Sequence, residues 1–201
     1  STEMDFYLAV DGSSMGPVGE VLRTSSAMGF KAMIVVNWSQ KKKISTFGAK
    51  GAESFMKQLH YSSWEKVKDD FQPTHDFIGI SARALGEEEG NSMAVENSTL
   101  PSRDGIIFVI GCGKKPVDDD GTFLTEAQRH ACNSFVHVTF PNESLSARVR
   151  YVLKASIVME RFAALRSNTS DSPGGGEREF EGEKFVLGTR ERRSDRVEQR
   201  G

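Results

Sequence analysis

Two short and almost continuous runs of apolar residues constrain the fold of this chain more than any other feature. They are residues 31–37 (KAMIVVN) and residues 105–111 (GIIFVIG). A strand with one solvated face alternates apolar and polar side chains, whereas a strand covered on both faces is apolar along its length. Both runs therefore predict strands inside a parallel sheet that has helices on its two faces.

Shorter strand and helix patterns alternate with these two runs. Strands are also predicted at residues 5–11, 76–80 and 135–138, and helices at 18–28, 49–59, 64–70 and 125–131. The polar residues 85–103 are predicted to form a loop. Regular alternation of strands and helices indicates an α/β domain with a mostly parallel sheet and helices on both faces.

The stretch from residue 142 to residue 166 predicts one long helix. Its start is marked by Asn142 or Ser144, and apolar residues follow at helical spacing. Ile157 and Val158 widen the apolar stripe beyond the face of about 100° that one packing surface needs. Two interpretations remain open: a buried helix of a single chain, and a helix that packs on its own sheet and also on a partner chain.

Composition argues against several classes of function. With 201 residues the chain has room for one domain, and its net charge of −2 does not indicate a dedicated nucleic-acid binder. No apolar run is long enough to span a membrane, and the cysteines and histidines lack metal-ligand spacing, so we expect neither a span nor a metal site. A Ser/Pro/Gly linker and a densely charged segment follow, which predicts a domain at 1–166 and a flexible tail at 167–201.

Two glycine-rich loops are weak signals of ligand binding. Residues 16–19 (GPVG) precede a predicted helix, where anions are often held, but a tight turn is the better interpretation. Residues 111–115 (GCGKK) follow a buried strand, at the edge where open α/β sheets bind ligands. This second loop is interpreted either as an anion or nucleotide site or as a solvated turn. The local motifs by themselves therefore define no reaction.

The order of four segments is more informative than any single motif. They are GPVGEVLRTSSAMGFKAMIVVN, then FGAKGAESFMKQLHYSSWEKVKDDF with DFIGISAR, then IIFVIGCGKKP, then FLTEAQRHACNSFVHVTFPNESLSARVRYVLKA. In this order they resemble the motifs of the SpoU/TrmH family of RNA ribose 2′-O-methyltransferases, and within it the branch that modifies the tRNA anticodon loop. The resemblance covers residues 5–166.

This resemblance implies a fold, a cofactor and a set of functional residues. The fold is an α/β knot (SPOUT), in which the C-terminal segment of a parallel sheet threads a deep trefoil knot. The implied S-adenosylmethionine pocket is lined by Ile80, Ser81, Gly111, Val138, Ser144 and Leu145. The family's catalytic arginine corresponds to Arg23. The implied contact with a second copy or a paralogue involves Leu145, Val149, Val152, Ser156 and Met159.

Three positions depart from the family pattern. Pro17 stands at the asparagine of the first motif, Gly113 at the glutamate of the second, and Ser146 at the asparagine of the third. Proline removes a side-chain amide and a backbone donor together, and serine cannot replace both hydrogen-bonding groups of an asparagine. The three losses predict a degenerate active site with weak or absent donor binding, in which Arg23 is a remnant or belongs to a site shared with a partner.

Three hypotheses for function follow from this combination of fold and departures. The first is an RNA-binding homologue without catalysis, a structural or assembly factor on ribosomal RNA, with ribosomal assembly proteins among its partners. The second is an active 2′-O-methyltransferase on ribosomal or transfer RNA, in which a partner subunit supplies the missing residues. The third is a dimeric domain that has also lost RNA binding. The first hypothesis is expected in a mitochondrial setting, with the cytoplasm as the alternative.

Overall fold

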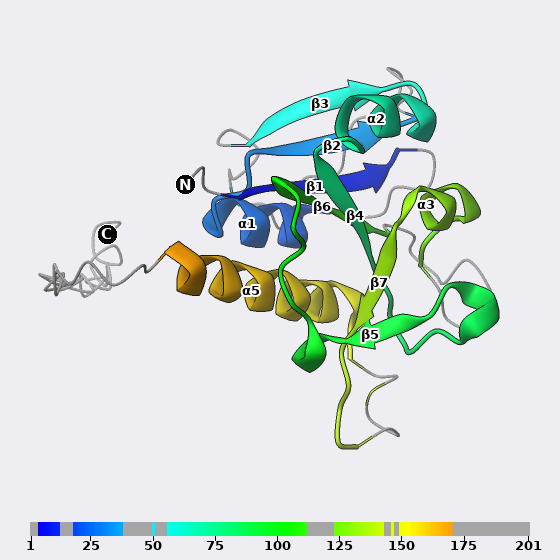
Figure 1. The fold of residues 1–201 in the computed structure, drawn as a ribbon, viewed down its shortest axis with the longest axis vertical. Helices are drawn as coiled ribbons and strands as arrows, with labels where there is room; N and C mark the ends of the chain where they lie inside the picture. Colours follow the sequence, from blue (N-terminus) through cyan, green and yellow to red (C-terminus); the bar gives the residue numbers. More distant parts are fainter. Residues whose placement is uncertain are drawn as a thin grey trace, which may run out of the picture. The chain divides into compact units, whose positions relative to one another are not determined.

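The computed structural model describes residues 4–12, 18–37, 50, 56–111, 123–142, 146 and 149–170. Its strands form one seven-stranded sheet in the order β3-β2-β1-β6-β4-β7-β5, and every pair of neighbouring strands is parallel (Figure 1). The strands are β1 Asp5–Asp11, β2 Ala32–Val36, β3 Lys57–Tyr61, β4 His75–Ile80, β5 Ser92–Ala94, β6 Gly105–Ile110 and β7 Ser134–His137. The α-helices are α1 Gly19–Ala27, α2 Trp64–Phe71, α3 Glu126–Ala131 and α5 Tyr151–Ser170. The predicted α/β class is confirmed.

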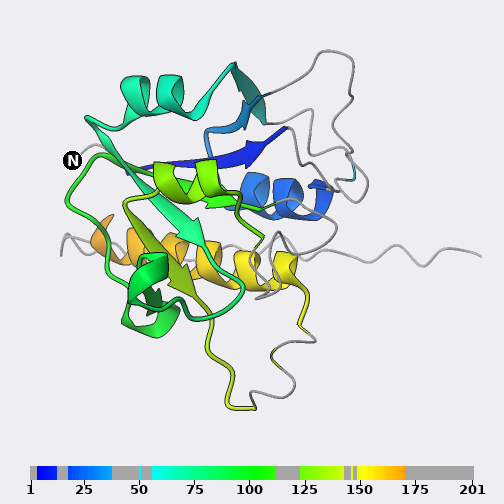
Figure 2. The same ribbon diagram turned by 90° about the vertical axis from the view of Figure 1, so that its right-hand side faces the viewer.

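Helices cover both faces of the sheet, as the two views in Figures 1 and 2 show. α1 and α5 pack on one face, where Leu22 and Phe162 join Phe108 of β6 in one buried cluster. α2 and α3 pack on the opposite face, where Val67 and Ala131 belong to a second cluster. β2 and β6 lie inside the sheet and are buried along their whole length. Their continuous apolar sequences predicted this placement.

Local sequence sets the ends of several helices. The Ser63 side chain accepts a hydrogen bond from the Lys66 N–H at the start of α2. Thr125 and Gln128 form a reciprocal capping box at the start of α3. Gly29 has φ of +74° just after α1, a left-handed conformation that favours glycine and ends the helix. The helices predicted at 18–28, 64–70 and 125–131 are therefore confirmed, with small shifts of their ends.

Two elements differ from the sequence prediction because strand pairing outweighs local pattern. The helix predicted at 49–59 is wrong over its described end, where β3 begins at Lys57 and pairs with β2 as an edge strand. The loop predicted at 85–103 contains β5, which pairs with β7 and extends the opposite edge of the sheet. Short edge strands are held by backbone hydrogen bonds to one neighbour, so they need no clear apolar alternation.

The last helix also differs at its start. α5 begins at Tyr151, whereas the sequence predicted a helix from residue 142 or 144. Before it, the Val149 N–H donates to the Ser146 carbonyl at 3.1 Å, which closes a separate turn. α5 then continues to Ser170, beyond the predicted domain end at residue 166. The predicted knot depends on residues 112–122 and 143–148, most of which lie outside the described residues, so the knot stays a prediction.

Two kinds of feature are absent from the described residues. No helix among them is long and apolar enough to cross a membrane. No cluster of histidine, cysteine, aspartate and glutamate side chains in the same ranges is arranged to hold a metal ion.

Candidate functional site at the carboxyl ends of the strands

The described part of the predicted donor pocket comes together at one edge of the sheet. β6, β4 and β7 are neighbours and parallel, so the residues that follow them lie side by side. These residues are Gly111 after β6, Ser81 after Ile80 of β4, and Val138 after β7. The Ser81 N–H donates to the Val136 carbonyl at 2.9 Å, which continues the ladder beyond the end of β4. Ser144 and Leu145 lie outside the described residues.

The side chain of Tyr151 lies between two of these strand ends. Its hydroxyl accepts a hydrogen bond from the Gly111 N–H at 3.0 Å and donates one to the Ile80 carbonyl at 2.7 Å. Tyr151 is the first residue of α5 and is only 8% exposed. A hydroxyl has one hydrogen to donate, and here that hydrogen is used on Ile80. Backbone groups of two residues predicted to line the donor pocket are thus bonded to a side chain of the same chain.

Phe123 completes this arrangement. Its ring stacks on the Tyr151 ring with centroids 4.6 Å apart and planes inclined by 10°. The Phe123 backbone also approaches Gly111 closely, since a Cβ atom at residue 111 would lie 1.9 Å from the Phe123 carbonyl oxygen. Only glycine fits at this position without moving the loop. The strand end, the Phe123 backbone and the two stacked rings therefore form one packed unit.

Lys154 lies one helical turn after Tyr151 and faces the same strand end. Its Nζ donates to the Ala82 carbonyl at 2.7 Å and lies 5.9 Å from the centre of the Phe140 ring. Burial lowers the pKa of Lys154. A buried ammonium is costly unless it is hydrogen-bonded, and the Ala82 carbonyl supplies that bond.

A buried histidine cross-links the strands at the end of β7. His137 Nδ1 lies 2.8 Å from Ser92 Oγ, and Ser92 Oγ also accepts a bond from the Leu85 N–H at 2.7 Å. The Ser92 hydroxyl and His137 Nδ1 share one hydrogen bond, and which of the two donates depends on the imidazole tautomer. Burial lowers the pKa of His137. This pair joins β5 to β7 one residue before Val138.

Arg83 ends the Gly79–Arg83 element that resembled the family pattern, and its guanidinium is bonded within the chain. It forms a two-pronged ion pair with the Glu89 carboxylate at 2.7 and 3.0 Å. These hydrogen bonds lower the pKa of Glu89. Arg83 therefore shapes the segment after β4.

Arg23 lies in a different place, in a groove between α1 and the start of α5. The groove has a volume of about 480 Å³. Its lining residues are Glu20, Arg23, Thr24, Val149, Arg150, Val152, Leu153 and Ser156. Arg150 and Glu20 are joined across it by an ion pair at 2.8 Å, and Leu153 is 54% exposed. The groove thus combines apolar surface from α5 with an exposed arginine of α1.

The groove contains part of the predicted partner contact. Val149, Val152 and Ser156 line the groove. They are therefore accessible at the surface, which a contact with a partner requires. Met159 is fully buried in the core of its own chain, so its assignment to a partner contact is wrong. Helical rotation explains the error, because Met159 shares a face with the core residue Ala155. Leu145 lies outside the described residues.

Sequence reasoning missed two residues that lie at the ends of these strands. Tyr151 and Lys154 were part of a quoted motif, but neither was given a role. The available signal was their spacing of three residues near the start of an otherwise apolar helix, which places both on one face.

Of the three departures from the family pattern, Pro17 and Gly113 lie outside the described residues. Ser146 is described, and its N–H donates to the Asn142 carbonyl at 3.1 Å.

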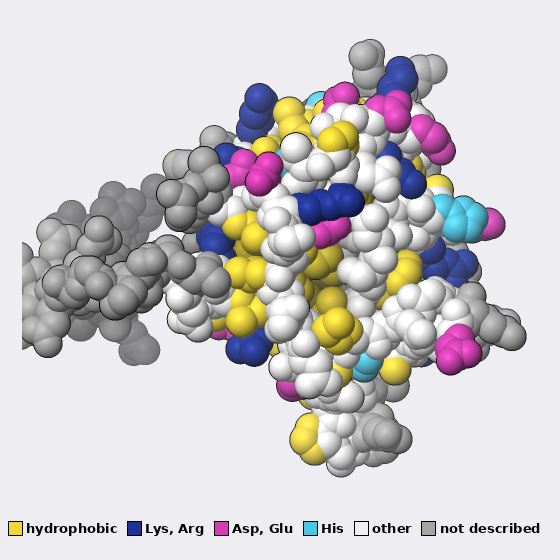
Figure 3. Space-filling view, viewed as in Figure 1, with side chains coloured by type: hydrophobic (Ala, Val, Ile, Leu, Met, Phe, Trp, Pro, Cys, Tyr) yellow, Lys and Arg dark blue, Asp and Glu magenta, His cyan; other side chains and the backbone are white. Residues whose placement is uncertain are grey.

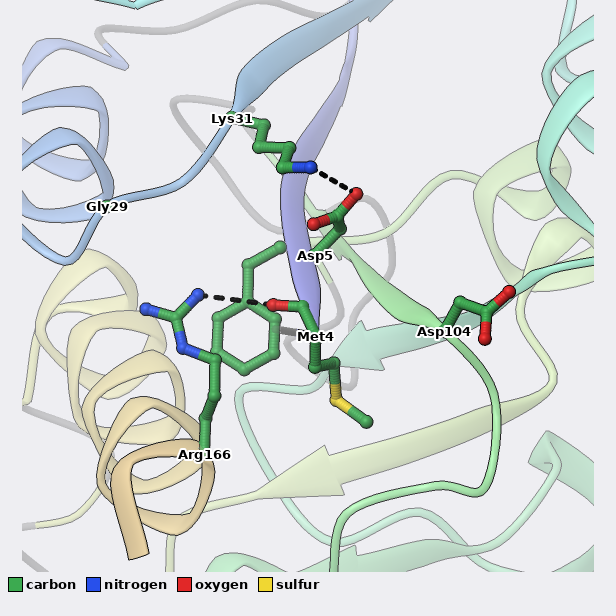
Figure 4. Close-up of a pocket in the computed structure, with 7 residues that line it drawn as sticks. Met4, Asp5, Gly29, Lys31, Asp104 and Arg166 are labelled. Atoms are coloured by element: carbon green, nitrogen blue, oxygen red, sulfur yellow. Dashed lines mark hydrogen bonds and ion pairs between the residues drawn. The ribbon is translucent and has the colours of Figure 1, made fainter. Parts of the chain in front are cut away.

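A second hollow, of about 430 Å³, lies near the amino ends of β1 and β2 (Figure 4). The guanidinium of Arg166 lies 4.3 Å from the centre of the Phe6 ring and donates to the Met28 carbonyl at 3.0 Å. Lys31 and Asp5 form an ion pair at 2.5 Å beside it. These contacts fasten the C-terminal half of α5 to β1 and to the end of α1. We therefore interpret the hollow as structural.

Comparison with solved structures shows which fold this is. The chain is similar to a TrmH/SpoU tRNA modifying enzyme from A. aeolicus, with a TM-score of 0.61 and 10% identity over 88% of this chain and 84% of the other. It is similar to the SpoU methyltransferase AviRb from Streptomyces viridochromogenes in complex with AdoMet, with a TM-score of 0.58 and 15% identity over 85% and 60% of the two chains. The chain is also similar to a protein whose structure is described as giving structural insights into the 2-OH methylation of C/U34 on tRNA. The TM-score is 0.56 and the identity 13%, over 83% of this chain and 99% of the other.

These likenesses define the fold as that of the SpoU/TrmH RNA methyltransferases. No protein-family profile and no curated protein matches the sequence. The predicted α/β fold of this family, without its knot, is therefore confirmed by structure, at sequence identities too low to carry over the activity of any relative.

Proposed function

We propose that this chain is an RNA-binding homologue of the SpoU/TrmH methyltransferases that does not catalyse methyl transfer and acts as a structural or assembly factor on ribosomal RNA. The observation that carries the proposal is a pair of hydrogen bonds: the Tyr151 hydroxyl accepts from the Gly111 N–H and donates to the Ile80 carbonyl. The residues present do not fit S-adenosylmethionine in the predicted pocket, because the Tyr151 side chain lies between two of the predicted lining residues and bonds to their backbone groups.

The chemistry of ribose methylation supports the same conclusion. A ribose hydroxyl is a poor nucleophile, so a catalyst must remove its proton and fix its geometry. The chain keeps Arg23, but a guanidinium is a hydrogen-bond donor and needs neighbours to position it. Pro17, Gly113 and Ser146 lack the amide and carboxylate groups that the family pattern provides. Loss of one positioning contact can reduce a rate about 10²-fold, and three are absent.

RNA binding is proposed for the basic residues that the resemblance places near the knot. They are Arg23, Lys41–Lys43 and Lys114–Lys115, of which only Arg23 lies in the described residues. The face seen in Figure 3 mixes Lys and Arg with Asp and Glu, so broad electrostatic attraction is not expected from it. Affinity for RNA is expected to fall steeply with salt if these residues neutralise phosphates, as counterion release requires. Salt-independent affinity, or unchanged affinity of Lys-to-Ala variants, contradicts this assignment.

The groove between α1 and α5 is the proposed contact with a second copy or a paralogue. Apolar side chains there, including Val152 and the half-exposed Leu153, are available to a partner. Val152→Asp should shift the chain towards monomers in sedimentation or light-scattering measurements, because it introduces a charge into an apolar contact. Ser167→Asp on the exposed end of the same helix is the matched control. A monomeric unmodified chain, alone and with candidate partners, contradicts the proposal.

The test of the proposed function is a methyl-transfer assay with labelled S-adenosylmethionine. The purified chain is incubated with ribosomal RNA and with transfer RNA, and donor binding is measured in parallel by calorimetry. The expected results are no transfer and no donor binding, together with measurable binding of ribosomal RNA. Methylation by the isolated chain refutes the proposal, and methylation only with a partner moves Arg23 into a shared active site. Crosslinking in cells would identify the RNA and would test the proposed mitochondrial setting.

A further inference from the structure

One edge of the sheet is attached through a contact that includes a titratable ring. Residues 85–97, which contain β5, are called the edge segment here (Figure 1). We infer that the edge segment is an acid-released flap, and that its latch is the contact between the His137 ring and the Ser92 hydroxyl. This inference goes beyond the proposed function, since it involves neither RNA nor the methyl donor.

Few contacts hold the edge segment to the rest of the domain. β5 is the last strand of the sheet, and it pairs with β7 over three residue pairs. Leu85 and Val95 bury their side chains, and the Thr139 hydroxyl donates to the exposed Glu96 carboxylate at 2.9 Å. A region with so few buried apolar side chains opens locally at a lower free energy than the whole domain.

The latch is satisfied only while His137 is neutral. Its Nδ1 lies 2.8 Å from Ser92 Oγ, and the same oxygen accepts a hydrogen bond from the Leu85 N–H at 2.7 Å. A neutral imidazole and the hydroxyl share one hydrogen in either tautomer. An imidazolium carries hydrogens on both nitrogens, so the Ser92 hydrogen then has no acceptor on His137. Protonation also places a charge on a residue that is only 7% exposed.

The charges around His137 do not compensate for its burial. The Glu96 carboxylate favours the imidazolium, but desolvation is the larger effect and lowers the pKa of His137. On α5, which also packs on β7, the Lys154 ammonium is bonded to the Ala82 carbonyl. The neighbouring strands bring no ionisable group, because β4 and β5 pair with β7 through Ile78, Gly79, Ile80, Ser92, Met93 and Ala94.

These properties couple opening of the edge segment to pH. When the segment opens, the His137 ring returns to water and to its ordinary pKa of 6.5. The open form therefore binds a proton at a higher pH than the closed form does. Opening becomes more favourable as the pH falls below 6.5 and through the lowered pKa of the closed form. The outer edge of β7 then loses its neighbour, and unpaired strand edges are the ones that pair with other chains.

Hydrogen exchange of backbone amides measures this opening in the full chain at pH 7.5 and pH 5.5, after correction for the intrinsic effect of pH. The opening constant of residues 85–97 should rise towards about tenfold, the limit for one proton at one pH unit below 6.5. His137→Asn keeps a polar group for Ser92 but does not titrate, so the rise should disappear. His75→Phe is the matched control, because His75 is buried at the opposite ends of the strands, and it should keep the rise.

A second variant keeps the test decisive if His137→Asn is insoluble. Glu96→Gln removes the charge that favours the imidazolium, so acid should open the edge segment more than in the unmodified chain. The inference is overturned if the unmodified chain shows no rise, if the rise persists in His137→Asn, or if Glu96→Gln does not increase it. These outcomes leave the proposed function untouched, because methyl transfer and RNA binding are measured separately.

Discussion

The two faces of α5 have opposite roles. The inner face carries Tyr151, Lys154 and Phe162, which are buried and reach the ends of strands or the centre of the core. The outer face carries Val152 and Leu153, which line an open groove beside Arg23. One helix therefore fills the space between the ends of β4 and β6 with one face and lines an open groove with the other. Changes to the inner face should alter stability and ligand access, whereas changes to the outer face should alter association alone.

The largest contrast is expected between Phe162→Ala and Leu153→Ala. Phe162 is 1% exposed and packs edge-on against Phe108 with ring centroids 5.3 Å apart. Its truncation should lower the free energy of unfolding by about 3–5 kcal/mol. Leu153→Ala on the outer face should change that quantity by less than about 0.5 kcal/mol. Urea denaturation of both variants measures the difference, and equal losses would contradict the division of α5 into two faces.

A smaller effect is expected from Tyr151→Phe. This change removes one oxygen and leaves the Gly111 N–H and the Ile80 carbonyl without that partner, at a cost of about 1–3 kcal/mol in unfolding free energy. Tyr61→Phe is the matched control, because its hydroxyl bonds to Asp70 at the exposed edge of the sheet. The control should cost less than about 1 kcal/mol. If the two variants lose the same stability in chemical denaturation, the Tyr151 bonds are not a buried structural link.

The pH dependence of stability extends the comparison to buried and exposed histidines. Burial lowers the pKa of His75 and of His137 below the ordinary value of 6.5. The unfolded chain therefore binds protons at a higher pH than the folded chain does, so stability falls as the pH drops below 6.5 and through the lowered pKa values. The melting temperature should decrease as the pH is lowered from 7.5 to 5, and it should decrease less in the His75→Phe variant. His130→Asn at an exposed position serves as the control. If His75→Phe leaves the slope of melting temperature against pH unchanged, His75 does not contribute to the pH dependence.

The smallest effect is expected from Arg150→Ala at the mouth of the groove. The ion pair with Glu20 joins side chains that are 70% and 40% exposed, so it should contribute less than about 1 kcal/mol. Screening should reduce this contribution further, since exposed charges interact weakly at high salt. Denaturation in low salt and in molar salt measures both effects. A large loss that persists in high salt would show that Arg150 supports the core and not only the outer face.

Much of the sheet was predictable because its signals are local. The apolar runs of β2 and β6 require burial on both faces, and the N-cap residues Ser63 and Thr125 mark the starts of α2 and α3. β3 and β5 were not predictable, since a short edge strand exists through backbone bonds to a neighbour that lies far away in the sequence. The same reason hid the role of Tyr151, whose partners precede it by 40 and 71 residues.

The sequence by itself determined the α/β class and the parallel core strands, because alternation and burial patterns belong to the residues themselves. The grouping of Ile80, Ser81, Gly111 and Val138 was implied only by the resemblance to the SpoU/TrmH family. The order of motifs also determined the likeness to SpoU/TrmH folds that the solved structures bear out. Only the tertiary structure decided that the Tyr151 hydroxyl bonds to the ends of two strands and that Met159 faces its own core. Both facts depend on the rotation of α5 against the sheet, and that rotation is set by packing across the whole domain.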